Sequence, residues 1–182
     1  ALNCVANGKI LKEKIFENLW IQPAAGDAGG SLGAALAYWY QELNMPRDQY
    51  YDRMRGAYLG PKFNDQDIEQ QLNSLNAKYS KKTADEISKE MAKELSNNKT
   101  VGWFQGRMEF GPRALGARSI LGDPRSDKMQ KNLNLKVKYR ESFRPFAPSI
   151  LAEDINDWFD INTTSPYMLM VSNVKNEKCI PM

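Results

Sequence analysis

The sequence predicts an α/β fold, and three observations on the order of its elements support this. Residues 19–25, LWIQPAA, have the apolar character of a short strand, and a glycine turn at 26–30 joins them to a helical stretch. Residues 100–104, TVGWF, are β-branched and aromatic, as strands commonly are. Helical patterns lie between these two runs, at 65–77 and from Thr83 onward. We therefore expect strands alternating with helices, with ligand-binding loops at the carboxyl ends of the strands.

Composition indicates a packed protein of ordinary globular character. The chain has 182 residues, of which 42 % are hydrophobic and 26 % are charged. No apolar run approaches the roughly 18 to 20 residues of a membrane span, and no cationic and apolar leader opens the chain. We expect a cytoplasmic protein with no membrane contact. Because the chain contains no histidine, its chemistry must rely on Asp, Lys, Arg and backbone dipoles, or on residues supplied from elsewhere.

Neither end of the chain has the features of a natural terminus, so we expect an excerpt from a longer protein. Ala1 opens the sequence without an initiator methionine, and Met182 closes a strand-like run, KCIPM. Cys4 and Cys179 lie near opposite ends without the spacing of a zinc or redox motif. Buried, reduced thiols are the favoured interpretation for both.

The glycine turn leads into a helix. Ser31 is the candidate N-cap, and the apolar residues that follow fall on one helical face, which predicts a buried helix. Asp27 within the turn suits either a cation or the free amides of the helix start, and by chemistry alone the capping role is favoured. Asn3 and Asn7, beside Gly8, have the character of turn residues, with ligand contact as the less favoured role.

The middle of the chain contains a break and further helices. Residues 44–64 are polar, aromatic and interrupted by glycine and proline, so we place a domain boundary there. The helix at 65–77 begins with acidic residues that suit its positive N-terminal end. The next helix opens on a capping box formed by Thr83 and Glu86, and its apolar residues repeat with helical spacing. Another helix is predicted from 126 to about 136.

Positive charge is concentrated in one stretch. Ten of the 25 Lys and Arg residues lie between Arg107 and Arg144, against four acids. Glycine and proline interrupt its first part, and they would cost about 1 and 3 kcal/mol in a helix interior, so this part must be a loop. Arginine binds phosphate or carboxylate through a planar fork of donors, and glycine lets an anion approach the backbone. The stretch therefore predicts a pocket for a phosphorylated ligand.

The candidate binding residues fall into two segments of this stretch. The first segment contains Gln105, Gly106, Arg107, Arg113, Arg118 and Ser119, and the second contains Asn134, Lys138, Arg140 and Arg144. Ser119 and Asn134 can add neutral hydrogen bonds, whereas Glu141 is better suited to orient an arginine than to act as a base. A lone arginine would more often pair with a carboxylate such as Glu109 or Asp123, but a cluster favours a ligand.

Aromatic residues among the cations support a rival interpretation, a nucleic-acid surface. Side chains available to stack on bases are Trp103, Phe104, Phe110, Tyr139, Phe143 and Phe146. However, the net charge is only +3, and a groove that follows a phosphate backbone normally needs a broader basic face. Nucleic acid is therefore the less favoured partner.

Several motifs resemble the O-carbamoyltransferases of nodulation and antibiotic biosynthesis. These motifs are ALNCVANGKI at 1–10, QPAAGDAGGSLGAAL at 22–36, GWFQGRMEFGPRALGARSIL at 102–121, LN at 133–134, VKYRE at 137–141 and FRPFAPS at 143–149. They are long, they occur in the order found in that family, and they extend over nearly the whole chain.

The resemblance implies the end of an actin-like ATPase-type domain followed by a YrdC-like α/β domain, truncated at both ends. Residues 1–50 would be the remnant of the actin-like carbamoyl-transfer domain, 51–62 a linker, and 63–182 an incomplete YrdC-like domain. The YrdC-like domain would convert carbamoyl phosphate and ATP, with Mg²⁺, to carbamoyl adenylate, releasing pyrophosphate and phosphate. The other domain would pass the carbamoyl group to a hydroxyl of a sugar or antibiotic-like acceptor, with a bound metal that is usually iron.

The resemblance also implies roles for individual residues. Asp27 matches a metal-ligating aspartate, which replaces the capping interpretation, and Asn3, Gly26 and Gly29 match a region that lies against the adenylate. The cations that would hold carbamoyl phosphate and the nucleotide phosphates are Arg107, Arg113, Arg118, Lys138, Arg140 and Arg144. Because the metal-binding histidines of the family would lie upstream, we expect this piece alone to lack a complete transfer site.

Three functions stay open on the sequence alone. The favoured one is a step of ATP-dependent O-carbamoyl transfer. The others are a tRNA-like nucleic-acid binding module and a catalytically incomplete fragment whose pocket fails to bind nucleotide. The acceptor, the metal and the oligomeric state, including a homo-oligomer, are left undetermined.

Overall fold

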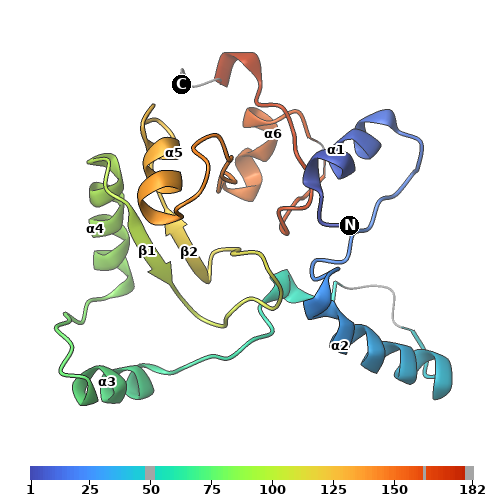
Figure 1. The fold of residues 1–182 in the computed structure, drawn as a ribbon, viewed down its shortest axis with the longest axis horizontal. Coiled ribbons are helices and arrows are strands. Elements are labelled where there is room, and N and C mark those ends of the chain that lie inside the picture. The colour runs from blue at the N-terminus through green and yellow to red at the C-terminus, as the bar shows by residue number, and fades with distance from the viewer. Residues whose placement is uncertain (48–51, 162, 179–182) are drawn as a thin grey trace.

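The computed structural model describes residues 1–47, 52–161 and 163–178, and in them it combines short helices with a two-stranded sheet (Figure 1). The main elements are α1 (Cys4–Glu13), α2 (Asp27–Ala37), α3 (Asp65–Ser74), α4 (Ala84–Ser96), β1 (Val101–Phe104), β2 (Arg118–Leu121), α5 (Met129–Asn132) and α6 (Ile155–Trp158). Short helical turns are η1 (Tyr38–Glu42), η2 (Arg55–Ala57), η3 (Leu133–Val137), η4 (Ala152–Asp154) and η5 (Asn176–Lys178). At this coarse level, the mixture of helices and sheet agrees with the predicted α/β class.

The two strands form an antiparallel hairpin closed by the long loop 105–117. Phe104 pairs with Arg118 at the loop end of the hairpin, and Val101 pairs with Leu121 at the other end. In Figure 1, α4 lies beside β1. The strand predicted at 100–104 is therefore confirmed as β1, and β2 is an element that the sequence did not reveal.

Capping boxes begin both α3 and α4. The side chain of Asn64 accepts a hydrogen bond from the amide of Asp67 (2.8 Å), and Thr83 accepts one from the amide of Glu86 (3.3 Å). In each case the acidic side chain accepts in return from the amide of the cap residue. The helices predicted at 65–77 and from Thr83 are confirmed, although α3 ends three residues earlier than expected.

Two expectations for the turn that precedes α2 are wrong. Residues 19–25 do not form a strand, and a turn closed by the amide of Ala25 on the carbonyl of Gln22 (3.1 Å) occupies their end. Proline has no N–H to donate to a neighbouring strand, so Pro23 disfavours a strand here. In the described structure, no strand pairs with residues 19–25. The N-cap of α2 is Gly26, which has no side chain to form a cap bond, so Ser31 lies inside the helix instead of capping it.

α2 is also exposed, although its pattern predicted a buried helix. No residue of α2 is buried in the described structure, and Leu36 and Trp39 expose 43 % and 46 % of their surface. Of the predicted apolar face, Leu32 packs against the core. Figure 1 shows the helix pointing away from the other elements.

α1 corrects the interpretation of Asn3 and Asn7 as turn residues. The side chain of Asn3 caps the helix by accepting from an amide of the first turn (3.1 Å). Asn7 lies inside the helix, is only 8 % exposed, and donates through Nδ2 to the carbonyl of Leu169 (2.9 Å). A Cβ at Gly8 would lie 2.7 Å from the Val171 side chain. Glycine therefore allows α1 to approach the C-terminal segment closely.

The main apolar core joins the start, the middle and the end of the chain. Its buried centre consists of Met54, Ala57, Tyr167 and Leu169, and the side chains that pack against it are Leu2, Ile21, Leu32, Phe110 and Leu115. Two of the central residues come from the segment 51–62, which the sequence suggested as a linker, and residue 51 lies outside the described residues. The predicted domain boundaries stay a prediction.

Other sequence expectations have mixed outcomes. The helix expected from 126 to about 136 begins later, at Met129, and continues through η3 to Val137. Cys4 is partly rather than fully buried, and Cys179 lies outside the described residues. No helix in the described part of the chain is long and apolar enough to cross a membrane.

Candidate functional site

The loop between β1 and β2 forms part of the wall of a cavity of about 330 Å³. The cavity is lined by Tyr58, Gln105, Gly106, Arg107 and Ala117. This volume lies at the low end of the range for small-molecule sites. Three of the predicted site residues, at 105–107, thus lie together at the carboxyl end of β1.

Backbone hydrogen bonds hold both sides of this loop. The amide of Gln105 donates to the carbonyl of Ala117 (3.0 Å), which extends the hairpin beyond its last strand pair. Met108 accepts from the amide of Gly60 and donates to the carbonyl of Pro61, each at 2.9 Å. The wall of the cavity is therefore fixed by main-chain bonds and does not depend on the exposed side chains.

Arg107 is exposed at this cavity and keeps free donors. Its Nη1 donates to the carbonyl of Gly60 (2.6 Å), whereas its Nε and Nη2 have no partner among the described residues. Gly106 precedes it with φ +60°, a left-handed conformation that glycine adopts without strain. A guanidinium with free donors beside an open glycine backbone is suited to an oxyanion.

Arg113 lies outside the lining of the cavity and faces the start of the chain. Its Nη2 donates to the carbonyl of Leu2 (3.0 Å). Its Nε is buried without a hydrogen-bond partner in the described structure. An unsatisfied buried donor costs roughly 1–3 kcal/mol, and this nitrogen has no surface open to a ligand in the described structure.

Glu109 is a fully covered carboxylate at the centre of the loop, with 0 % of its side chain exposed. Its Oε1 accepts from the amides of Leu115 (2.7 Å), Ala117 (2.8 Å) and Arg118 (3.3 Å), and its Oε2 accepts from Nε of Arg118 (3.1 Å). Burial raises the pKa of this group, but the hydrogen bonds outweigh burial and lower the pKa of Glu109 to about 2.

Pairing of arginine with a carboxylate, the alternative to a ligand cluster, is confirmed for two residues. Arg118 pairs with Glu109, and Arg125 pairs with Asp123. Arg118 still has Nη1 and Nη2 without partners among the described residues, and 37 % of its side chain is exposed. The neighbouring Ser119 Oγ accepts a hydrogen bond from a loop amide 3.0 Å away. Arg118 thus combines an internal bond with donors that can reach outward.

The second basic segment is organised around Asn134, which is fully buried. Its Nδ2 donates to the carbonyls of Ser142 (3.1 Å) and Arg144 (2.8 Å), and its Oδ1 accepts from Nε of Arg140 (2.6 Å). The guanidinium of Arg140 also lies 4.9 Å from the ring centre of Phe146. In this arrangement Asn134 holds the segment together and has no amide hydrogen free for a ligand.

The rest of the second segment is exposed. Arg144 donates to Glu141 (2.7 Å), which confirms the expectation that Glu141 orients an arginine, and this bond lowers the pKa of Glu141. Lys138 is exposed. Among the described residues, no hydrogen bond or ion pair joins this segment to the loop 105–119. The grouping of these cations around one ligand stays a prediction.

The predicted residues near the chain start form a third group at the beginnings of α1 and α2. Asn3 caps α1, and Gly26 is the N-cap of α2, so Asp27 is not the cap. A Cβ at Gly29 would lie 2.0 Å from the carbonyl oxygen of Ala24, so this position requires glycine. No group of three or more His, Cys, Asp or Glu in the described part of the chain could hold a metal ion. Asp27 can supply one ligand at most, and these residues alone do not fit a metal site.

Two parts of the chain match the two halves of one protein family. Residues 92–181 match the family model described as Carbamoyltransferase C-terminus, and residues 1–36 match the one described as Carbamoyltransferase N-terminus. The chain belongs to the carbamoyltransferase family. The resemblance drawn from the motifs is therefore confirmed.

Curated relatives are similar along almost the whole chain. It is 54 % identical to an uncharacterized protein of Synechocystis sp., over 100 % of the chain and 30 % of that relative. It is 42 % identical to nodulation protein NolO of Bradyrhizobium diazoefficiens (98 % of the chain, 33 % of the relative) and 34 % identical to nodulation protein U of Rhizobium fredii (96 % and 27 %). The chain thus spans 27–33 % of the length of these relatives.

Polar bonds join the two carbamoyltransferase regions. Asn7 bonds to Leu169 and Arg113 bonds to Leu2, each pair connecting the N-terminal match to the C-terminal match. The predicted metal ligand Asp27 belongs to the first region, and the cavity residues from the β1–β2 loop belong to the second.

Three residues in or beside the β1–β2 loop were not among the predicted site residues. Tyr58 and Ala117 line the cavity, and the hydroxyl of Tyr58 donates to the carbonyl of Leu115 (2.6 Å). No local signal places Tyr58, because it comes from the segment suggested as a linker. Glu109 did carry a signal, since it is an acid surrounded by cations in the loop.

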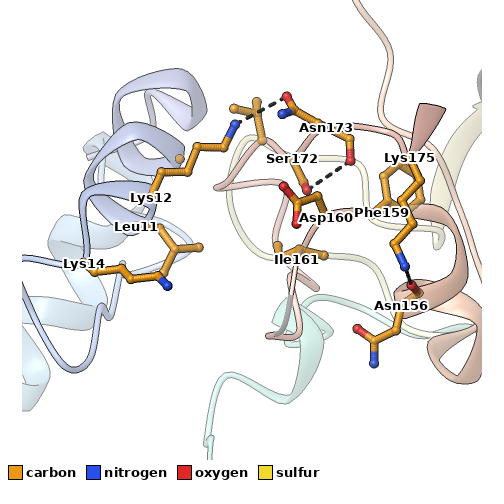
Figure 2. Close-up of a pocket in the computed structure, with 12 residues that line it drawn as sticks. Leu11, Lys12, Lys14, Asn156, Phe159, Asp160, Ile161, Ser172, Asn173 and Lys175 are labelled. Atoms are coloured by element: carbon orange, nitrogen blue, oxygen red, sulfur yellow. Dashed lines mark hydrogen bonds between the residues drawn. The ribbon is translucent and has the colours of Figure 1, made fainter.

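A larger cavity, of about 550 Å³, lies between α1 and the C-terminal segment (Figure 2). None of the predicted site residues lines it. Lys12 at its rim donates to Oδ1 of Asn173 (3.3 Å), and Lys175 donates to the carbonyl of Asn156. These two lysines are bonded to neighbouring polar groups, a third lysine, Lys14, also lines the cavity, and no side-chain donor of the described lining is buried without a partner.

Proposed function

We propose that the chain supplies the carbamoyl phosphate site of an ATP-dependent O-carbamoyltransferase. The observation that carries this proposal is the cavity at the end of β1, with Gln105, Gly106 and Arg107 on its wall. These three residues lie in the region that matches the carbamoyltransferase C-terminus. A small cavity with one free guanidinium suits a small dianion better than a large apolar ligand.

The charges available near the cavity suit a reaction between two anions. Carbamoyl phosphate and ATP repel each other, so cations must offset their charge before they react. Arg107, on the cavity wall, has two free nitrogens, and Arg118, which follows the lining residue Ala117, has two free terminal nitrogens. These donors support the proposal because they come from one loop whose backbone is held on both sides.

The proposed reaction consumes carbamoyl phosphate, ATP and water, and gives carbamoyl adenylate, phosphate and pyrophosphate. A hydroxyl of a sugar or antibiotic-like acceptor then takes the carbamoyl group, and AMP leaves. Lys138, Arg140 and Arg144 are the proposed contacts for the nucleotide phosphates, with Mg²⁺ accompanying ATP. Arg140 and Arg144 would exchange bonds to Asn134 and Glu141 for bonds to phosphate oxygens.

The finer fold assignment belongs to the same proposal. Residues 1–50 would end an actin-like carbamoyl-transfer domain, and 63–182 would belong to a YrdC-like domain. In the first of these, Asn3, Gly26 and Gly29 would lie against the adenylate, and Asp27 would contribute one ligand to iron or another divalent metal. Because the described residues alone do not fit a metal site, the other ligands would have to come from outside them.

A second candidate function, nucleic-acid binding, is favoured by one observation. Phe104, Tyr139 and Phe143 expose 62 %, 85 % and 77 % of their surface beside the basic residues. Exposed aromatic rings among cations can stack on unpaired bases. The affinity for nucleic acid would fall steeply as salt concentration rises. The affinity of a small pocket with few ionic contacts would fall less.

Calorimetric titration of the chain with carbamoyl phosphate and with ATP tests the proposal. Arg107→Ala should weaken carbamoyl phosphate binding about tenfold or more, because one charge-assisted hydrogen bond contributes roughly 1.5–3 kcal/mol. Arg125→Ala is the matched control, since Arg125 lies in the same basic stretch but pairs with Asp123 and does not line the cavity.

Equal affinity of the wild type and Arg107→Ala would show that the site is wrongly assigned. If the wild type bound neither ligand at low salt, the chain would be a catalytically incomplete fragment.

A further inference from the structure

We infer that Glu109 is a positioning residue for the carbamoyl phosphate site, an inference that rests on the proposed function. Glu109 does not line the cavity. Its covered carboxylate instead gathers three backbone amides and the Nε of Arg118 at 2.7–3.3 Å. A single side chain therefore holds the segment 115–118, the end of the loop that leads into β2.

Two short series of hydrogen bonds connect Glu109 to the cavity wall. In the first, Glu109 accepts from the amide of Ala117, and the carbonyl of Ala117 accepts from the amide of Gln105 (3.0 Å). In the second, Glu109 accepts from the amide of Leu115, and the carbonyl of Leu115 accepts from the hydroxyl of Tyr58 (2.6 Å).

The ends of these two series, Gln105 and Tyr58, are lining residues, and so is Ala117 in the middle of the first series. Gly106 and Arg107 come immediately after Gln105, so their placement depends on the first series. Tyr58 also lines the cavity, and the second series holds its hydroxyl. Beside the main-chain bonds of Met108, one carboxylate that does not line the cavity thus helps to hold Gln105, Ala117 and Tyr58.

The chemistry of this position requires an ionised carboxylate. All four donors point at the two oxygens of Glu109, and none of the side chain is exposed to water. A glutamine would have one oxygen for the amides, and its NH₂ group would face the Nε–H of Arg118, so two donors would oppose each other. Water could not relieve this conflict, because the site is covered.

The carboxylate also fixes the direction of Arg118. Its bond to Nε leaves Nη1 and Nη2 free and holds the guanidinium at the edge of the loop. Losing this bond would let the side chain choose among rotamers and weaken its contribution to an anion site. Glu109 therefore acts through Ala117, Leu115 and Arg118, and not by contact with substrate.

The test compares Glu109→Gln, Glu109→Asp and a control, Asp123→Asn, in the full chain. Asp123 is also a buried carboxylate, 8 % exposed, that pairs with an arginine just after the same hairpin, but it has no connection to the cavity wall. Two quantities are measured for each variant: calorimetric affinity for carbamoyl phosphate, and hydrogen exchange at the amides of Leu115, Ala117 and Arg118. Thermal melting establishes which variants are folded.

We expect Glu109→Gln to lose exchange protection at those three amides and to bind carbamoyl phosphate about tenfold more weakly, while Asp123→Asn keeps wild-type affinity. Glu109→Asp keeps the charge but is one methylene shorter, so it should fold more readily and show an intermediate loss of affinity. If Glu109→Gln does not fold, the affinity and hydrogen exchange of Glu109→Asp test the inference instead.

Three results would overturn the inference. The first is wild-type affinity in a folded glutamine or aspartate variant, which would leave the proposed function intact. The second is loss of folding in both variants, which would make Glu109 purely structural. The third is an equal loss of affinity in Asp123→Asn, which would show that general destabilisation is the cause. Failure of the wild type to bind carbamoyl phosphate would instead overturn the proposed function, and the inference with it.

Discussion

Nδ2 of the buried Asn7 donates to the carbonyl oxygen of Leu169, 2.9 Å away in space and 162 residues later in the sequence. The bond joins α1, in the region that matches the carbamoyltransferase N-terminus, to the region that matches the C-terminus. Arg113 and Leu2 form a second such bond at 3.0 Å. The two regions are thus connected by specific polar bonds close to the main apolar core.

Replacing Asn7 by alanine should destabilise the chain by roughly 1–3 kcal/mol, because the buried carbonyl of Leu169 would lose its donor. Urea unfolding followed by circular dichroism measures this change. Asn132→Ala is a suitable control, since Asn132 is an exposed helical asparagine. Equal unfolding midpoints for wild type and Asn7→Ala would show that this bond does not hold the two regions together.

Glu109 should make stability depend on acid pH. Its folded-state pKa is about 2, below the ordinary value of 4.5. The carboxylate therefore contributes stability above pH 4.5 that is lost as pH falls toward 2. At neutral pH, Glu109→Gln should lower the free energy of unfolding by an amount on the order of 3 kcal/mol, and this difference should shrink as pH falls through that window.

Urea unfolding at pH 7, 5, 4 and 3 measures the difference between wild type and Glu109→Gln. Asp85→Asn serves as the control, because Asp85 and Lys89 form an exposed pair with 73 % and 76 % of their side chains accessible. Such a pair contributes about 1 kcal/mol or less. A difference for Glu109→Gln that stayed constant between pH 7 and pH 3 would contradict the assignment of its pKa.

The contribution of the α4 capping box to the free energy of unfolding should be measurable independently of the cavity. Thr83→Ala removes the acceptor for the amide of Glu86 and should cost about 1 kcal/mol. Ser88→Ala within the same helix should change stability by only a few tenths of a kcal/mol, because alanine has the higher helix propensity. Similar effects of both substitutions on the unfolding midpoint would argue against the cap.

Tyr167 should make stability depend on alkaline pH. Burial and the hydrogen bond to Asp52 raise the pKa of Tyr167 to about 12 from an ordinary value of 10.0. Between these values the folded chain keeps a proton that the unfolded chain has lost, so stability falls as pH rises through this window. Tyr167→Phe should remove that decline.

Unfolding of wild type and Tyr167→Phe between pH 9 and pH 11.5 measures this effect. Tyr79→Phe is the control, because Tyr79 is 46 % exposed and, among the described residues, its hydroxyl bonds to Asn73. If the wild type and Tyr167→Phe lost stability in parallel, Tyr167 would not be the group responsible.

Local signals in the sequence were sufficient for some elements and not for others. Thr83 and Glu86 are neighbours in sequence and form their cap without outside help, so α4 could be predicted. β2 depends on pairing with a strand 17 residues earlier, and its short sequence, RSIL, has no distinctive alternation. Residues 19–25 are apolar without a strand partner, and apolarity alone does not distinguish a strand from a buried turn.

The site shows the same division between local and distant information. Gln105 to Arg107 are contiguous, so their grouping followed from the sequence. The partners of the other cations did not, because they depend on tertiary contacts: Glu109 for Arg118, Leu2 for Arg113 and Asn134 for Arg140. Tyr58 joins the cavity through a contact between segments that are far apart in sequence.

The most direct test of the central claim is the location of bound carbamoyl phosphate on an isotope-labelled chain by NMR. Titration should shift the amide signals of Gly106, Arg107 and Ala117 in a saturable way, with smaller changes elsewhere. No shift at these amides, or shifts confined to the cavity beside α1 at residues such as Gly8 and Ser172, would contradict the proposed site.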